Sequence, residues 1–331
     1  MRSTLPPLSA ARFFTTWHFD PWVAGVTVSL VVLYLAGVRR ARRGAGWPTW
    51  RAWSFVVLGA GSLVFATMSS LGVYDRALLW PAAVQITMLL TVTPLCLGLG
   101  DPIRLAIQTL PGRGGAWVEA VLHSPPIRVL TFPPVGAVLA TLTQFGIFFS
   151  GYLGAAMRSE TVLHLLQLQV VVTGCLFAMP LLGVELLPSW CTQPIRMAFA
   201  GLDGLLDAVP GIAVLSASGP ITQFYVHAHP AWAGTVVHDQ WIAGGLMITV
   251  SELIALPFVA VLFRAWIKED ARAAAAVDRR LDANAARARR LGASPADRAG
   301  VVDDPTRPWW EVDPGPLADR AERYGWRHRQ D

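Results

Sequence analysis

Charged residues and cysteines are both scarce in this sequence. Charged residues make up 15% of the 331 positions, well below the share in a typical soluble domain. The three cysteines, Cys96, Cys175 and Cys191, form no CxxC pair and are odd in number, a pattern that favours neither a disulfide framework nor a zinc site. The N-terminus lacks a compact signal peptide with a small-residue cleavage site, so we expect the first apolar segment to remain in the mature protein.

The positive charge of the chain is not accompanied by a nucleic-acid or phosphate motif. The net charge is +5, and arginine supplies nearly all of the basic residues, with Lys268 as the single lysine. The sequence has no glycine-rich phosphate loop and no aromatic RNA-binding motif. We therefore interpret the charge as a determinant of membrane topology and expect no nucleic-acid partner.

Long apolar segments fill most of the chain. Hydrophobic residues make up 53% of it and the mean hydropathy is +0.45, which is typical of a multi-pass membrane protein. The sixth apolar segment is interrupted by Asp203, Asp207, Pro210 and Gly211, so its first turns could lie along the membrane interface instead. We predict an all-α fold, a bundle of seven transmembrane helices at 22–38, 53–71, 77–99, 129–157, 161–183, 199–224 and 240–266.

Arginines are unevenly divided between the two sides of this bundle. The loops after the second, fourth and sixth segments hold only Arg76 and Arg158, whereas those after the first, third and fifth hold Arg39, Arg40, Arg42, Arg43, Arg51, Arg104, Arg113, Arg128 and Arg196. The positive-inside rule then places the N-terminus outside and the C-terminus in the cytoplasm. We expect an outer leader at 1–17, a membrane domain at 18–267, a basic cytoplasmic helix at 268–291 that can contact lipid or a partner, and a disordered tail at 292–331.

Most histidines fall on the outer side in this topology. His18, His227, His229 and His238 lie in outer segments, and His164 lies about one turn inside the fifth segment. Imidazole and thioether groups suit copper, and Met68 and Met157 are also near the outer surface. These five histidines are candidate metal ligands. The alternative is that loop histidines are simply solvated, because an HxH pair with a distant histidine is a weak signal.

A second layer of polar residues lies deeper in the apolar segments. By helical rise, Gln85, Gln144 and Gln169 share one depth, and Glu160, His164 and Gln167 share one helix face. Glu252 lies near the middle of the seventh segment, where an ionisable group is costly and indicates function. We expect Gln85, Gln144, Gln169 and Glu252 to be buried. Hydrogen bonding between helices is the alternative role for the amides.

Several motifs in order along the chain resemble the CtaG-type cytochrome c oxidase assembly factors of actinobacteria. Each motif is weak alone, but their order from residue 18 to about 282 is fairly specific. They are His18-Phe19-Asp20-Pro21, Leu33-Tyr34-Leu35-Ala36-Gly37-Val38-Arg39-Arg40, Arg51-Ala52-Trp53-Ser54-Phe55, Tyr74-Asp75, Pro94 with Leu99-Gly100-Asp101-Pro102, His164 with Gly174, Asp239-Gln240 with Gly244-Gly245, Ser251-Glu252-Leu253, and Trp266 with Asp270, Arg272, Asp278 and Arg279.

The resemblance implies a copper chaperone, not an enzyme, in the bacterial plasma membrane. Such a protein would deliver copper at the outer face and associate with cytochrome c oxidase subunits and membrane lipid. The sequence departs from the family pattern in the third segment, where Ala82 and Ile86 occupy the positions of a histidine pair around Gln85. The fourth segment has Phe148, Phe149 and Tyr152, and the fifth has Gln169, where relatives often carry histidine. Amides are poor copper ligands, so these departures argue against an intramembrane copper site.

Three functions remain open on the sequence alone. The first is an assembly or accessory factor that handles copper for the respiratory haem-copper oxidase. The second is a structural subunit that docks on an oxidase without binding metal. The third is a permease for copper or a small solute, with Glu252 and the amides along its path. A haem-binding subunit is disfavoured, because within the predicted segments His164 is the one histidine available as an axial ligand.

Overall fold

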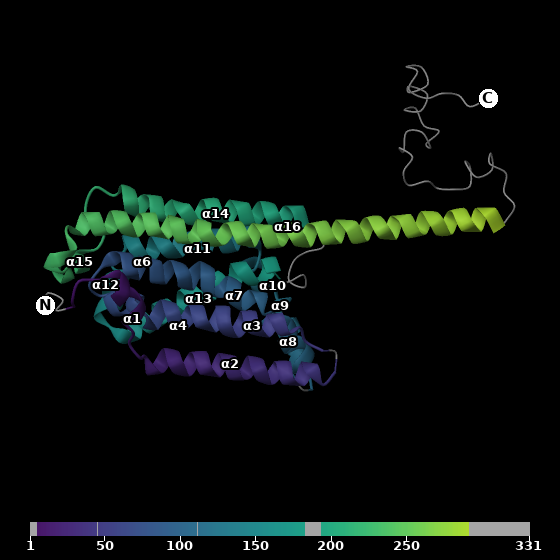
Figure 1. The fold of residues 1–331 in the computed structure, drawn as a ribbon, viewed down its shortest axis with the longest axis horizontal. Coiled ribbons are helices and arrows are strands. Elements are labelled where there is room, and N and C mark those ends of the chain that lie inside the picture. The colour runs from purple at the N-terminus through teal and green to yellow at the C-terminus, as the bar shows by residue number, and fades with distance from the viewer. Residues whose placement is uncertain (1–4, 45, 111, 183–192, 291–331) are drawn as a thin grey trace, which may run out of the picture. The chain divides into compact units, whose positions relative to one another are not determined.

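The computed structural model describes residues 5–44, 46–110, 112–182 and 193–290, and these residues contain helices but no strand. Six helices or helix runs are long and apolar enough to cross a membrane: Pro21–Arg42, Thr49–Tyr74, Leu79–Leu99, Glu160–Leu182, Met197–Ser216 and Val236–Pro257. A bent pair, Pro133–Phe149 and Tyr152–Arg158, makes a seventh if it is counted as one span. The all-α, multi-span prediction is confirmed (Figure 1).

The first three spans are α2 and two composite runs. Helix α2 is Pro21–Arg42, preceded by the short α1 (Ala10–Thr15). The second span joins α3 (Thr49–Trp53), the π-helical η1 (Ser54–Ala60), α4 (Gly61–Met68) and α5 (Ser70–Tyr74). The third joins α6 (Leu79–Thr87), the π-helical η2 (Met88–Val92) and α7 (Thr93–Leu99).

The remaining helices complete the bundle. The segment after the third span carries the short helices α8 (Pro102–Thr109), α9 (Gly114–Leu122) and α10 (Pro125–Leu130). The spans that follow are α11 (Pro133–Phe149) with α12 (Tyr152–Arg158), α13 (Glu160–Leu182), α14 (Gln193–Ser216) and the first part of α16 (Val236–Arg290). Between the last two lie α15 (Gln223–Ala228) and η4 (Ala231–Ala233).

The chain divides after Arg264 into two compact units, and all candidate spans belong to the first. Within that unit, α13 packs against α7 and α11, and α11 packs against α14. The alanine-rich residues 268–290 of the second unit are helical, as part of α16. The tail predicted at 292–331, the beginning of the leader at 1–4 and Cys191 lie outside the described residues.

A proline and a glycine set the close packing of α13 on the third span. Pro94 has no N–H to donate to the carbonyl of Leu90, one turn earlier, and π-helical geometry appears at this point. Gly174 of α13 packs directly onto that carbonyl, since a Cβ at Gly174 would lie only 1.9 Å from the Leu90 oxygen. A second close contact joins α14 to α16, where a Cβ at Gly244 would lie 2.6 Å from the carbonyl oxygen of Gly211.

The fourth predicted span is bent in the structure, and the sixth ends earlier than predicted. The fourth, predicted as continuous over 129–157, bends by 66° between α11 and α12. Ser150 is extended there, and its hydroxyl accepts a hydrogen bond from the backbone N–H of Tyr152, which starts a new helix. The sixth span ends at Ser216 and not at Phe224, because Gly219 and Pro220 do not continue a helix.

Candidate functional site

The starts of α2 and α13 place a carboxylate beside an imidazole. Asp20 caps α2, and its Oδ1 accepts hydrogen bonds from the backbone N–H groups of Trp22 and Val23 at 2.9 and 3.2 Å. Its second oxygen, Oδ2, lies 2.8 Å from Nε2 of His164, about one turn into α13. The cap therefore fixes the carboxylate, and the carboxylate orients the ring of His164.

A cavity of about 570 Å³ surrounds this pair, and we call it the His18 cavity. Polar residues from three regions of the chain line it: His18, Asp20, Thr67, Asp75, Arg76, Glu160, His164 and Gln167. The predicted shared face of Glu160, His164 and Gln167 is confirmed, because all three side chains face the same cavity. The backbone N–H of His18 donates to the carbonyl of Met68 at 2.9 Å, which holds this residue at the wall.

Burial and neighbouring charges set the protonation of the cavity. Burial lowers the pKa of His18, with Asp20 opposing and Arg76 adding to the effect. Burial also disfavours the Asp20 carboxylate, but hydrogen bonds from His164, Val23 and Trp22 outweigh it, so the pKa of Asp20 lies below its ordinary value. Burial raises the pKa of Asp75 to about 7, against the opposing effect of Arg76. A neutral His18 and an ionised Asp20 are the forms that suit metal coordination.

The five predicted metal ligands do not gather in one place. His18 and His164 line the His18 cavity. The exposed His227 has its Nδ1 3.2 Å from the carbonyl oxygen of Gln223, and His238 stacks on Trp241. His229 lies with its Nε2 3.7 Å from Oδ2 of Asp239. Within the described residues, no three His, Cys, Asp or Glu side chains are close enough together to hold a metal ion.

The two methionines predicted near the outer surface belong to the hydrophobic core. Met68 and Met157 are buried in the same cluster as Leu63, Ala82 and Ile86. The ligands of a copper ion in the His18 cavity would therefore be imidazole and carboxylate groups. His18 and His164 are the residues that would supply the imidazoles.

Asp239 and Gln240 have a structural role that sequence spacing did not indicate. The carboxylate of Asp239 accepts hydrogen bonds from the backbone N–H groups of Leu79 and Trp80, at 2.7 and 3.3 Å, and so caps α6. The amide of Gln240 donates to the carbonyl of Val214 at 3.2 Å and accepts from the backbone N–H of Ile221 at 2.9 Å. These contacts hold the loop between α14 and α15 against α16.

The predicted layer of buried amides is only partly present. Gln85 and Gln144 are each 1% exposed. The amide nitrogen of Gln85 donates to the carbonyl of Ala66 at 3.0 Å, while neither end of the Gln144 amide has a described partner. The prediction of burial is wrong for Gln169, which is exposed and accepts from the hydroxyl of Tyr152 at 3.0 Å. Glu252 is half-buried.

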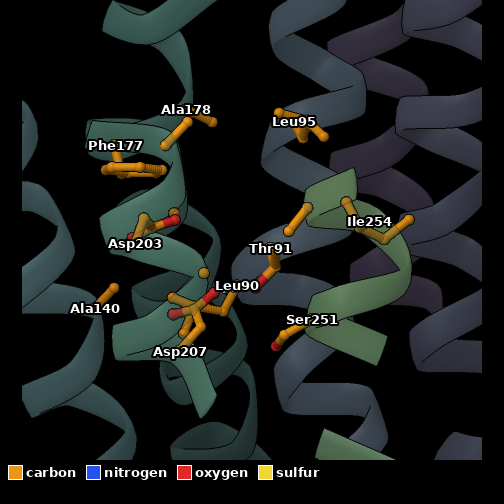
Figure 2. A pocket seen from close by; sticks show the side chains of 14 residues that line it. Leu90, Thr91, Leu95, Ala140, Phe177, Ala178, Asp203, Asp207, Ser251 and Ile254 are labelled. Atoms are coloured by element: carbon orange, nitrogen blue, oxygen red, sulfur yellow. Dashed lines mark hydrogen bonds between the residues drawn. The ribbon is translucent and has the colours of Figure 1, made fainter. Parts of the chain in front are cut away.

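A second, smaller cavity lies deeper in the bundle, and we call it the Asp207 cavity (Figure 2). Asp203 and Asp207 face it from successive turns of α14, Thr91 from η2 and Ser251 from α16. The hydroxyl of Thr91 donates to Oδ2 of Asp207 at 3.3 Å. The sequence signal was two aspartates at i, i+4 within an apolar segment, a pattern that by itself indicates only an interrupted span.

Known proteins are similar to this chain along most of its length. A family model described as cytochrome c oxidase caa3 assembly factor matches residues 32–269. Uncharacterised proteins of Mycobacterium bovis and Mycobacterium tuberculosis are each 29% identical over 295 residues, which cover 84% of this chain and 43% of theirs. One from Mycobacterium leprae is 26% identical over 293 residues, covering 83% and 43% respectively. The chain thus spans less than half the length of these relatives. No solved structure matches it.

Proposed function

The chain belongs to the cytochrome c oxidase caa3 assembly factor family, and from this premise we propose that it helps to assemble a haem-copper oxidase in the bacterial plasma membrane by holding copper in the His18 cavity. Copper is the cargo in this role, and the protein binds it and passes it on without catalytic turnover.

The contact between His164 and Asp20 is the observation that carries the proposal. With Nε2 donating to the carboxylate at 2.8 Å, the Nδ1 of a neutral His164 keeps its lone pair for a metal. A carboxylate bonded to the far nitrogen of a ligating imidazole fixes the tautomer and makes the ring a better ligand. His18, on the wall of the same cavity, supplies a second imidazole, and its lowered pKa keeps it neutral near pH 7.

A closed metal site has more protein ligands than the two imidazoles of the His18 cavity. A site with few protein ligands suits an ion that is passed on. A structural site surrounds its metal with protein ligands, whereas a site with open positions can exchange its metal with a partner. The His18 cavity has space for ligands from such a partner, which we propose to be an oxidase subunit.

The distribution of arginine supports delivery at the outer face. The His18 cavity is built at the N-terminal end of α2, whereas Arg39, Arg40 and Arg42 lie in the last turn of the same helix. Under the positive-inside rule the arginine end faces the cytoplasm and the cavity faces outward.

A docking subunit without metal is the second candidate function. Ala82 and Ile86, at the positions where the family pattern has histidine, are 0% and 1% exposed in the apolar core. This part of the bundle offers no imidazole to copper, and a purely structural role on the oxidase would use the same scaffold.

Oxidase assembly in cells that lack this gene separates the two functions. Complementation with the wild-type gene should restore both the activity and the copper content of the oxidase. His18→Ala and His164→Ala should restore neither, whereas His227→Ala, which changes an exposed histidine outside the cavity, should restore both. Full complementation by a His18→Ala/His164→Ala variant would favour the docking function.

A further inference from the structure

The Asp207 cavity carries an inference that does not depend on copper. Asp203 and Asp207 lie within the candidate span Met197–Ser216, and Asp207 is 5% exposed. Glu252, which is half-buried, follows the cavity-lining Ser251 in α16. None of the described residues that line the cavity is basic. Carboxyl groups in such a place either hold a proton or pair with a positive partner, because ionised groups are costly away from water.

Ser251 provides an independent sign that a ligand belongs in this cavity. Its side chain is 2% exposed, and its hydroxyl makes no hydrogen bond with any described residue. Figure 2 shows the hydroxyl directed toward the space between α16 and α14, into which Asp207 projects. A buried hydroxyl without a partner is costly, so a group that fills the cavity would remove this cost.

The size and chemistry of the cavity narrow the choice of ligand. Its volume of about 30 Å³ is enough for one small group. A bound metal cation would both neutralise the carboxyl groups and give the Ser251 hydroxyl a partner. Protonated carboxyl groups with one water molecule are the alternative, and the test below distinguishes the two by the response of the Tm to cations and to pH.

The groups that face the cavity with polar atoms are two carboxyls and two hydroxyls, from Asp203, Asp207, Thr91 and Ser251. Oxygen donors of this kind suit hard cations such as Na⁺, Ca²⁺, Mg²⁺ and Mn²⁺, whereas Cu(I) prefers sulfur or imidazole. We propose that the Asp207 cavity binds a single hard metal cation within the membrane, held by Asp203, Asp207, Thr91 and Ser251.

The test is cation binding by the purified full-length protein in detergent. After treatment with chelator and exchange into choline chloride, NaCl, CaCl₂, MgCl₂ and MnCl₂ are titrated separately at constant ionic strength while thermal unfolding is followed. One of these ions should raise the Tm in a saturable manner, because a ligand that binds only the folded state stabilises it. If the ligand is a divalent ion, elemental analysis should find one such ion per chain. If the ligand is sodium, a ²²Na⁺ binding assay should find one Na⁺ per chain.

The variants identify the site. Asp207→Asn should abolish the saturable shift, and Ser251→Ala should weaken binding by about 10-fold, in the range found for the loss of one supporting group at a metal site. Ser216→Ala is the control for Ser251→Ala, because its exposed hydroxyl bonds to the carbonyl of Ile212 in its own helix. Ser251→Ala keeps the test decisive if Asp207→Asn does not fold. A Tm that responds to pH but to none of the cations, a Tm that responds to neither, or an equal response in Ser251→Ala would each overturn the proposal.

Discussion

Nε2 of His164 lies 2.8 Å from Oδ2 of Asp20, and the other oxygen of the same carboxylate caps helix α2. The two residues are 144 positions apart in the sequence. One carboxylate therefore joins the start of the first span to the start of α13 and also orients an imidazole at the wall of the His18 cavity. The structural and chemical roles of Asp20 can be separated by substitution.

Asp20→Asn should weaken Cu(I) binding while leaving the fold nearly unchanged. Asparagine caps helices about as well as aspartate, but a neutral amide supports the imidazole less well than a carboxylate. We expect Cu(I) affinity to fall by about 10-fold to 100-fold, as for other partners of ligating histidines. Asp20→Ala should also lower the free energy of unfolding by about 0.5–2 kcal/mol, because it removes the cap. Competition titration with a Cu(I) chelator and chemical denaturation measure the two effects, and equal affinity in wild type and Asp20→Asn would contradict the assigned role.

The carboxyl group of Asp75 should make the free energy of unfolding fall as the pH rises. Its pKa is about 7 in the folded protein, against an ordinary value of 3.8 that applies once the chain unfolds, so the folded state holds a proton that the unfolded state releases. Its contribution is therefore fully present below pH 3.8 and is lost as the pH rises through about 7. Thermal unfolding between about pH 5 and pH 8 should show a declining Tm in wild type and a flatter profile in Asp75→Asn. Parallel profiles would show that another group causes the decline.

The ion pair of Arg51 and Asp101 should stabilise the opposite end of α2 and its neighbours. Nη1 of Arg51 lies 2.6 Å from Oδ2 of Asp101, and both side chains are about one-fifth exposed. The carbonyl of Gly100, next to Asp101, accepts a hydrogen bond from the hydroxyl of Tyr34. A double-mutant cycle of Arg51→Ala and Asp101→Ala should give a coupling energy of about 1–2 kcal/mol. This is smaller than the coupling energy of a fully buried pair, because solvent partly screens the two charges. Arg113→Ala, at an exposed arginine, is the control. Additive effects of the two substitutions would contradict the coupling.

Gly174 should tolerate no side chain. Alanine there would place its Cβ 1.9 Å from the carbonyl oxygen of Leu90, so α13 would have to move away from the third span. We expect Gly174→Ala to cost about 1–3 kcal/mol, as for other overpacked positions. Gly25→Ala is the matched control, because no atom lies within 4 Å of a Cβ at that helical position. The control should be neutral or stabilising by up to about 1 kcal/mol through helix propensity. Similar Tm losses for both variants would exclude the packing explanation.

Hydrophobicity and helical spacing predicted the spans and one wall of the cavity, because both depend on local sequence. Apolar length identified the spans, and i, i+4 and i+3 spacing placed Glu160, His164 and Gln167 on one face. Helical rise also placed Gln169 at the depth of Gln85 and Gln144, but the prediction that it is buried was wrong. Residues at the same depth can point in different directions around the helix axis. Gln169 is two residues beyond Gln167, which turns it about 200° around the helix axis.

Long-range contacts could not be predicted in this way. The bend at Ser150 lies between two apolar segments, so composition gave no sign of it. Asp203 and Asp207 looked like interruptions of a span, and only the approach of Thr91 and Ser251 from other helices identified a shared cavity. The outer histidines do not form one cluster, because each makes its own contacts. His229 lies near Asp239, and His238 stacks on Trp241.

Cu(I) binding by the purified full-length protein tests most directly whether His18 and His164 hold copper together. Titration against a chromogenic Cu(I) chelator under anaerobic conditions gives stoichiometry and affinity in one experiment. We predict about one Cu(I) per chain, with binding lost in His18→Ala and in His164→Ala and kept in His227→Ala, because imidazole suits copper and only the first two face the cavity. Absence of bound Cu(I), or unchanged binding in the His18→Ala/His164→Ala double variant, would contradict the copper role.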